Sequence, residues 1–496
     1  MAVRGYRVRS SPSALVWTGA LLAFGLLSLG VAHHQSGRSA RARAEQLPLR
    51  PVLVVDLAAN RKARDGKPLA ELESWRAAGD AIGRPVELFG GASLVDLDPT
   101  RYAAWVLPAQ ERLSDADWAA LDAYLATEGG VVLTGATGQR TEQGGERERS
   151  ALERLFPGEH FADPGSDATR LRVVGRSPLV AGLEPGAEIV FEGRGRALST
   201  TSPGVFDWRG EAGGSAVLHG RHRGAPVAWL GFSVAHLVDS NVALRVAANA
   251  LRFAAREPLL DLRPWPDGQP CAVLVDSGGA PDSSGSLCRA EEGEIAGPGL
   301  DRLLRSGCRF ATIAAGERVL PEVLTRSGGA FVTIPEPRPR RDAQGAALMR
   351  ELLSGYDLAE RMGSVFSLRS EASWRAAEGR EALFASVGQE LGLRGAWFAR
   401  PDELADWWLA RALVEARIES LAPGSVRVVF TNRGEAVVRG VTARIYVPGG
   451  ANTPRVESTR LFARRALLRL ATDHGWIELV SRPLDPGAEV SYTLRF

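Results

Sequence analysis

An acidic residue directly follows an apolar run in the segment CAVLVDSGGAPDS, which extends from Cys271 to Ser283. The run before Asp276 has the composition of a buried β-strand, and the residues after it form a glycine-rich loop. A strand that ends on a carboxylate can place a general base or a metal ligand at the mouth of a site. Ser277 and Asp282 stand in the same loop and are further polar candidates. We therefore predict a binding or catalytic site at this strand end.

The chain around this segment, residues 257–412, consists of short apolar runs that alternate with helical stretches. Repeated units of this kind predict a compact, incomplete β/α barrel. Three phrases within it resemble the polysaccharide deacetylase family: WPDG at 265–268, the turn and strand at 307–312, and WFARPDELADWW at 397–408. The resemblance implies a deacetylase-like β/α barrel in this part of the chain.

Active members of that family remove acetyl groups with a divalent metal, which is held by an aspartate and a histidine pair spaced H-x-x-x-H. The resemblance implies that Asp276 stands at the position of the catalytic base, and Ser277 at that of the metal-binding aspartate. No histidine occurs between His236 and His474, and Arg369 replaces a further family histidine. We therefore expect no metal cofactor, and we interpret Asp276 as a remnant that can accept a hydrogen bond from a sugar.

Two alternatives to a degenerate deacetylase stay open. One is an active, metal-dependent hydrolase of acylated glycans, with a divalent ion held by oxygen ligands around Asp276. The other is a purely structural assembly protein that uses its α/β domain as an interface.

Aromatic side chains are the second kind of candidate for a binding role. Trp397 and Trp407, together with Trp265 and Trp408, could offer flat rings to the faces of sugar rings. Trp407 and Trp408 are neighbours on one predicted helix and cannot both face inward. We therefore expect one of these two rings to be partly exposed.

Residues 49–256 form an earlier block of alternating strands and helices. The runs PVLVVDLA at 51–58, YAAWVLP at 102–108 and GGVVLTG at 129–135 have the composition of buried parallel strands. The helix between the last two can be capped by Ser114 or Asp115, and the glycine pair 129–130 ends it. This alternation predicts a parallel sheet covered by helices.

The same block resembles the glutamine-amidotransferase-like superfamily. The matching phrases are YAAWVLPAQERLSDADWAALDAYLATEGGVVLTG, then SPLVAGL at 177–183 and APVAWLGFSVAH at 225–236. Active members carry a nucleophilic cysteine on a tight turn after a strand, whereas this block contains no cysteine. We do not expect Thr137, in the turn after the third strand, to replace it. The block is therefore predicted to serve contacts or ligand binding.

The tail, residues 413–496, alternates apolar and polar residues in short runs separated by turns. This pattern predicts a β-sandwich, similar to the Ig-like modules of secreted carbohydrate-active proteins. The three cysteines, Cys271, Cys288 and Cys308, permit either one disulfide and one thiol or three buried thiols.

The N-terminus contains 19 residues without a charge, 14–32, after three arginines. That length suits a membrane-spanning helix, and we favour an uncleaved anchor over a cleaved signal peptide. The sequence thus predicts a membrane anchor and linker over 1–48, an inner-membrane location, and a body in the periplasm or outside the cell.

The predicted fold class is multidomain α/β: a membrane helix, a parallel-sheet amidotransferase-like domain, a deacetylase-like barrel and a β-sandwich. The net charge of +2 gives no field that would recruit nucleic acid. We interpret the protein as a catalytically degenerate deacetylase-like protein whose partner is an envelope polysaccharide or an envelope protein. The predicted binding residues are Asp276, Ser277, Asp282, Arg369, Trp397 and Trp407.

Overall fold

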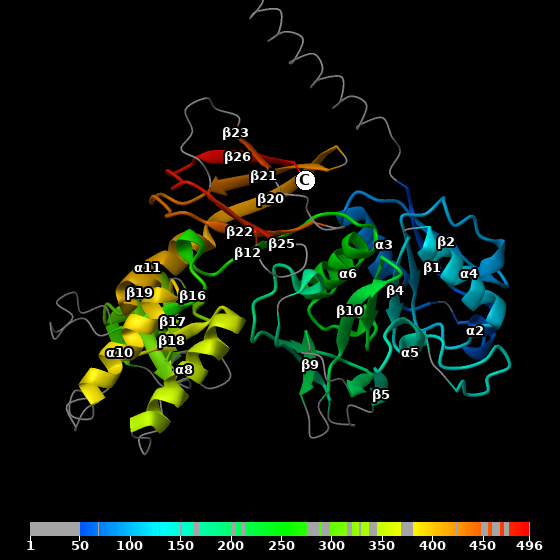
Figure 1. Ribbon diagram of the computed structural model, residues 1–496, viewed down its shortest axis with the longest axis horizontal. Helices are drawn as coiled ribbons and strands as arrows, with labels where there is room; N and C mark the ends of the chain where they lie inside the picture. Colours follow the sequence, from blue (N-terminus) through cyan, green and yellow to red (C-terminus); the bar gives the residue numbers. More distant parts are fainter. Residues whose placement is uncertain are drawn as a thin grey trace, which may run out of the picture.

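One six-stranded sheet organises the first part of the chain in the computed structural model, in the order β10-β11-β4-β3-β1-β2 (Figure 1). The four inner strands run parallel and are buried at every residue, which their unbroken apolar runs require. The edge strand β10 pairs antiparallel with β11. The strands are β1 (Val52–Val55), β2 (Val86–Phe89), β3 (Ala104–Leu107), β4 (Gly130–Thr134), β10 (Val217–His222) and β11 (Ala225–Leu230).

Helices cover both faces of this sheet. Trp75 of α3 and Val246 of α6 belong to the core that includes Val54 on one face. Trp118 of α4 belongs to the core that includes Leu53 on the other face. The helices are α2 (Ala58–Ala63), α3 (Leu72–Ala81), α4 (Asp115–Ala126), α5 (Ala151–Leu155) and α6 (Ser240–Ala254). Two small antiparallel sheets complete this part, from β5 (His160–Ala162), β6 (Arg170–Val173), β7 (Glu188–Val190), β8 (Ala197–Ser199) and β9 (Phe206–Arg209).

The structure describes residues 50–495 apart from 68, 128, 149–150, 163–167, 176, 194, 200–204, 210–213, 276–286, 290–297, 315–319, 327–328, 337–344, 369–379, 423, 448–454, 459–466 and 471–475. Within these described ranges no helix has the length and apolar character needed to cross a membrane. The predicted fold class, which included such a helix, is corrected accordingly. The segment predicted to form it, 14–32, lies outside the described residues, and the inner-membrane location that depended on it is not retained.

The second part of the chain holds two separate small sheets. One is parallel, in the order β18-β13-β19, and the other has the order β14-β15-β17-β16. The strands are β13 (Ala272–Leu274), β14 (Leu287–Arg289), β15 (Phe310–Ala314), β16 (Glu322–Arg326), β17 (Gly329–Glu336), β18 (Val365–Ser367) and β19 (Trp397–Ala399). The helices are α7 (Pro298–Arg305), α8 (Gly345–Met362), α10 (Arg380–Leu393) and α11 (Pro401–Ala412).

This arrangement corrects the prediction of a β/α barrel, because the described strands do not form one continuous sheet. One physical reason is the connection between β16 and β17, which is only two residues long. So short a connection cannot contain a crossover helix, and the two strands therefore pair antiparallel. The regular alternation of strand and helix ends there. Cys308, before β15, is disulfide-bonded, whereas the buried thiol of Cys271 donates a hydrogen bond to the Ser364 carbonyl at 3.2 Å.

The C-terminal part consists of two four-stranded antiparallel sheets, β20-β21-β26-β23 and β12-β22-β25-β24. Their strands are β12 (Leu259–Leu262), β20 (Val414–Ala422), β21 (Ser425–Asn432), β22 (Thr442–Tyr446), β23 (Arg455–Ser458), β24 (Leu467–Leu470), β25 (Trp476–Val480) and β26 (Glu489–Arg495). β12 follows directly on the first domain in sequence, yet it pairs with β22. β12 therefore belongs to the C-terminal sheets, although it precedes the second part in the sequence.

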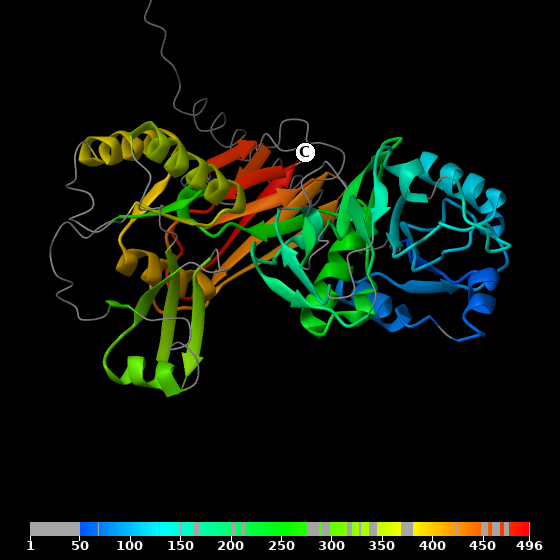
Figure 2. The same ribbon diagram turned by 90° about the horizontal axis from the view of Figure 1, so that it is seen from below.

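The C-terminal sheets contact both of the other parts (Figure 2). Phe253 of α6 packs against Tyr446 of β22, with ring centroids 5.7 Å apart, and Tyr446 packs against Trp476 of β25. On the other side, the tryptophans of β19 and α11 share a core with strands β21, β22 and β25. The three parts thus meet around the C-terminal sheets.

Candidate functional site

The parallel strands β13, β18 and β19 end side by side. Leu274 is paired with Ser367 on one side and with Ala399 on the other. The amide of Val275 continues the ladder with a 3.1 Å hydrogen bond to the Ala399 carbonyl. The predicted site residues Asp276, Ser277, Asp282 and Arg369 come after these strand ends, but they lie outside the described residues. Their roles stay predictions.

The predicted aromatic residues Trp397 and Trp407 do come together. Their rings meet edge to face with centroids 6.3 Å apart, and Trp397 also packs on Trp265 at 6.1 Å. Trp397 is 7 % exposed, Trp407 6 % and Trp408 4 %. The expectation that Trp407 or Trp408 would be partly exposed is therefore wrong. Both are buried because α11 is covered on one side by β15, β17 and β19 and on the other by the C-terminal sheets.

A groove opens above this tryptophan cluster, between α11 and the loop that follows β21. Its volume is about 990 Å³. We call it the Trp397 groove; its lining includes Trp397, Phe398, Trp407, Asn432, Val437 and Arg439. Leu413 and Val437, also in the lining, are 50 % and 58 % exposed, so the rim of the groove is apolar on both sides. The two predicted tryptophans thus contribute to the wall of an open groove, with their faces largely covered.

The loop wall of the groove is fixed by one buried amide. Asn432 Nδ2 donates to the carbonyl oxygens of Ala436, Leu484 and Asp485 at 2.8, 3.0 and 3.2 Å, and Asn432 Oδ1 accepts from the Gly434 amide at 2.9 Å. Asn432 itself has no exposed surface. Because all of these bonds are internal to the protein, the loop keeps its shape without a ligand.

The WPDG phrase of the sequence contacts Arg439, a residue of the groove lining. Arg439 lies with its guanidinium carbon 5.7 Å from the Trp397 ring centroid, and its Nη2 contacts Asp267 Oδ2 at 2.7 Å. Asp267 has φ +53°, a left-handed conformation that aspartate tolerates better than most residues. The Gly268 amide donates to Thr442 Oγ1 at 2.7 Å. The phrase therefore docks the second part of the chain onto β22 and orients Arg439 over the groove.

The polar lining of the Trp397 groove is balanced in charge. Three arginines and three carboxylates contribute to it: Arg309, Arg433, Arg439, Glu403, Asp406 and Glu435. Arg309 and Asp406 are 3.5 Å apart, and Arg433 bonds Glu415 outside the lining at 3.0 Å. Guanidinium groups donate hydrogen bonds and carboxylates accept them. Together they can therefore bond neighbouring hydroxyl groups of a ring-shaped ligand. Sequence reasoning missed this wall because it depends on contacts between residues 309, 397–410 and 432–439.

The carboxyl ends of the first sheet form a second conspicuous region, around Glu71. This residue is buried, and it accepts hydrogen bonds from Thr134 Oγ1 and Trp75 Nε1, both at 3.1 Å. Burial raises the pKa of the Glu71 carboxyl to about 7. Sequence reasoning gave Glu71 no role; the one signal was its spacing of four residues from Trp75 on an amphipathic helix.

The turns beside Glu71 are tight. Ala109 and Gly135 have φ of +45° and +56°. The Thr137 hydroxyl, buried in the second turn, donates a hydrogen bond that the carbonyls of Leu107 and Thr134 share at 2.9 and 2.7 Å. The Thr137 hydroxyl is thus held by backbone carbonyls and closed to solvent. Among the described residues, no three or more histidine, cysteine or acidic side chains gather as metal ligands would.

No protein-family model matches the chain, and no curated protein sequence does. Among solved structures, the chain is similar to Gan42B, a GH42 beta-galactosidase from G. stearothermophilus, at 9 % identity and a TM-score of 0.31 over 90 % of this chain and 40 % of that one. It is similar to alpha-L-fucosidase isoenzyme 2 from Paenibacillus thiaminolyticus at 11 % identity and a TM-score of 0.29, over 92 % and 50 %. A ThuA-like protein from Bacteroides uniformis matches at 10 % identity and a TM-score of 0.30, over 42 % and 92 %.

These are weak likenesses in structure to glycoside hydrolases and to one ThuA-like protein. The chain spans 40, 30 and 31 % of the length of three of the beta-galactosidases. Similarity at this level assigns no activity to the chain. The resemblances to deacetylases and amidotransferases that the sequence suggests therefore stay predictions.

Proposed function

We propose that this protein binds a polysaccharide in the Trp397 groove without cleaving it. The observation that carries the proposal is the make-up of that groove. Exposed apolar side chains, among them Leu413 and Val437, share its lining with three arginines and three carboxylates, whose charges balance. Sugars are bound by this combination, because their C–H faces pack on apolar and aromatic surface while their hydroxyls bond planar polar groups.

The size and rigidity of the groove favour a chain over a single sugar. A volume of about 990 Å³ lies at the upper end of the range for small-molecule sites, about 300–1,000 Å³. Its loop wall is held by Asn432 before any ligand arrives, so binding costs little ordering of the protein. An open, preformed groove of this kind accommodates several rings in a row.

A binding role rather than hydrolysis is supported by the sequence. The chain has no histidine between His236 and His474 and no cysteine before Cys271. Hydrolysis with a bound zinc ion ordinarily draws on histidine ligands, and an amidotransferase-like reaction needs a nucleophile. The parts of the chain that resemble enzymes lack those groups.

Affinity gel electrophoresis of the purified protein in gels containing soluble polysaccharides tests the proposal. Acetylated xylan and glycol chitin are suitable probes. We expect retardation in at least one gel, and loss of it in Arg439→Ala, which removes the guanidinium over Trp397. The matched control is Arg417→Ala, an exposed arginine of β20 outside the groove lining, which should still be retarded.

Two results would contradict the proposal. If no polysaccharide retards the wild-type protein, the groove is not a glycan site. If the protein releases acetate from chitooligosaccharides or acetylated xylan in a metal-dependent reaction that Asp276→Asn abolishes, it is an active deacetylase instead.

A further inference from the structure

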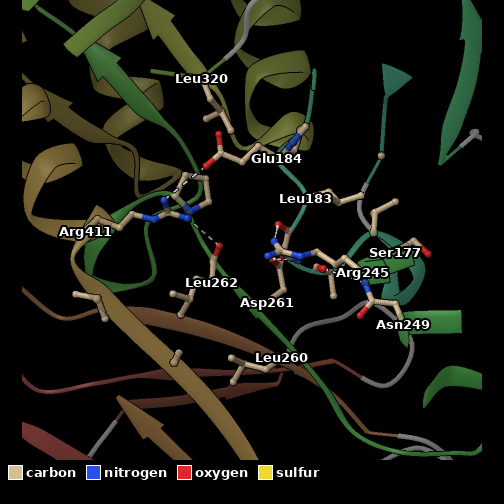
Figure 3. A pocket seen from close by; sticks show the side chains of 18 of the residues that line it. Ser177, Leu183, Glu184, Arg245, Asn249, Leu260, Asp261, Leu262, Leu320 and Arg411 are labelled. Atoms are coloured by element: carbon tan, nitrogen blue, oxygen red, sulfur yellow. Dashed lines mark hydrogen bonds and ion pairs between the residues drawn. The ribbon is translucent and has the colours of Figure 1, made fainter. Parts of the chain in front are cut away.

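A cavity of about 600 Å³ lies where the three parts of the chain meet (Figure 3). Its lining comes from the loop 177–185 and helix α6 of the first domain, from β12 and the end of α11, and from β20 and β25 of the C-terminal sheets. It is separate from the Trp397 groove, with which it shares no lining residue. Every part of the described protein thus contributes a wall.

The first-domain wall is a loop fastened to helix α6. Asn249 is buried, and its Nδ2 donates to the carbonyls of Leu179 and Ala181 at 3.3 and 2.9 Å. Arg245, one turn earlier on α6, donates to the Gly182 carbonyl from the cavity side (Figure 3). Because Asn249 Nδ2 bonds the loop carbonyls, the side-chain oxygen of Asn249 is the atom that can accept a hydrogen bond from a ligand.

The lining from β12 and the end of α11 carries one acid and one base. Asp261 Oδ1 accepts a hydrogen bond from the Gly182 amide at 3.2 Å, which ties β12 to the first domain. Arg411 Nε and Nη2 donate to the carbonyls of Arg263 and Leu262 at 3.2 and 3.4 Å. Its Nη1 lies 3.7 Å from Glu184 Oε1, across the cavity (Figure 3). Burial lowers the pKa of the Arg411 guanidinium from its ordinary value.

The charges of the cavity already balance one another. Two guanidinium groups, Arg245 and Arg411, face two carboxylates, Glu184 and Asp261. Each of the four contacts a protein group, so a charged ligand would leave one charge uncompensated in a partly buried space. An uncharged ligand can add hydrogen bonds to the remaining N–H groups and lone pairs without displacing any of these contacts.

Apolar side chains form the rest of the lining. Leu260, Leu262, Leu320 and Trp476 contribute to it, and Trp476 belongs to the aromatic contact between the domains. The ligand that fits is therefore uncharged, carries both donors and acceptors, and has an apolar face. A sugar of one or two rings has these properties, and a volume of about 600 Å³ is within the range of sites for molecules of that size.

We propose that this cavity binds a short, uncharged saccharide, one or two rings long, which bridges the first domain and the C-terminal sheets. The bound sugar bonds Arg245 of α6, Asp261 of β12 and Arg411 of α11. Because it contacts both the first domain and the C-terminal sheets, it stabilises their arrangement by an amount that rises with the ratio of its free concentration to its Kd. This inference does not depend on the Trp397 groove, and its test separates the two.

The test is isothermal titration calorimetry of the full chain with glucose, galactose, N-acetylglucosamine and their disaccharides. Glucose 6-phosphate and glucuronate are the charged probes.

Three variants separate the cavity from the groove. Ala416→Phe places a ring in the cavity from β20. Asp261→Asn keeps an acceptor for the Gly182 amide but replaces the lone pairs of the second carboxylate oxygen with N–H donors. Arg439→Ala alters only the groove. Circular dichroism of each variant checks that it folds.

We expect at least one uncharged sugar to bind with one site per chain. Asp261→Asn should weaken binding at least about tenfold, the loss expected for a charge-assisted hydrogen bond. Ala416→Phe should abolish binding, and Arg439→Ala should leave it unchanged. The inference is overturned if no uncharged sugar binds, if the charged probes bind more tightly, or if folded Asp261→Asn binds as the wild type does. It is also overturned if Arg439→Ala removes binding, since the sugar then occupies the groove.

Discussion

The indole nitrogen of Trp407 donates a 2.7 Å hydrogen bond to the carbonyl oxygen of Pro264. This bond joins α11 to the residue that precedes the WPDG phrase, in the interior of the cluster formed with Trp265 and Trp397. Trp407, which the sequence suggested as a sugar-binding residue, thus uses its one polar group, the indole N–H, in a hydrogen bond to the backbone. Its role is to fix the docking of the second part of the chain on the C-terminal sheets.

Trp407→Phe should therefore lower stability more than an equivalent change next to it. The Pro264 carbonyl would stay buried without its donor, and the smaller ring would leave a void, for a loss of about 2 kcal/mol. Trp408→Phe is the matched control, because the Trp408 nitrogen donates to no group among the described residues. Urea unfolding of both variants measures the difference. Equal losses would show that the Pro264 bond contributes nothing specific.

Local patterns in the sequence predicted the first sheet closely. The helix with a cap at Ser114 or Asp115 begins at Asp115, and Ser114 makes a capping box with Asp117. The apolar runs at 51–58, 102–108 and 129–135 contain β1, β3 and β4. These features depend on residues within a few positions of one another, so spacing and composition are sufficient to place them.

Features that depend on distant contacts could not be predicted in this way. The pairing of Leu260 with Ile445 places β12 in the C-terminal sheets, and no local pattern distinguishes it from a strand of the second part. The burial of both Trp407 and Trp408 likewise requires a second layer on α11, which only the folded chain supplies. Half of the charged groups that line the groove, Arg433, Glu435 and Arg439, come from a loop more than thirty residues after Trp397.

Asn432 should be the residue whose loss most disturbs the groove wall. Asn432→Ala removes donors from three carbonyls and an acceptor from Gly434, at a cost of roughly 2–4 kcal/mol. We expect faster hydrogen exchange of the amides between 432 and 439, measured by mass spectrometry, and weaker retardation by polysaccharide. The neighbouring change Arg433→Ala, at an exposed ion pair, should cost less than about 1 kcal/mol. Unchanged exchange in Asn432→Ala would contradict this account.

The contact between Arg439 and Asp267 should affect binding more than stability. Both side chains are about half exposed, so Asp267→Asn should cost less than about 1 kcal/mol. Asparagine also tolerates the left-handed backbone at this position, so the turn should be kept. Without the carboxylate, Arg439 is no longer held over Trp397, and we expect polysaccharide binding to fall several-fold. Asp357→Asn, a change on α8 that breaks the exposed contact with Arg394, is the control and should bind normally. Equal binding by both variants would show that the orientation of Arg439 is unimportant.

The buried carboxyl of Glu71 should make stability fall as the pH rises. Its pKa is about 7 in the folded protein, whereas the ordinary value for a glutamate is 4.5. Below pH 4.5 the group is protonated in both states and has no effect. Between pH 4.5 and 7 the unfolded chain loses the proton while the folded protein keeps it, so the folded state is progressively disfavoured. At about 1.4 kcal/mol per pH unit, the loss reaches about 3 kcal/mol above pH 7.

Glu71→Gln removes this titration while keeping an amide that can bond Thr134 and Trp75. The difference in unfolding free energy, variant minus wild type, should increase by about 3 kcal/mol from pH 4.5 to pH 8. Urea unfolding at four or five pH values measures it, and the change with pH is independent of any constant cost of the substitution. Glu73→Gln, on the exposed side of the same helix, is the control and should show little pH dependence. A flat difference for Glu71→Gln would mean that the carboxyl is ionised in the folded protein, and that Thr134 and Trp75 stabilise its charge.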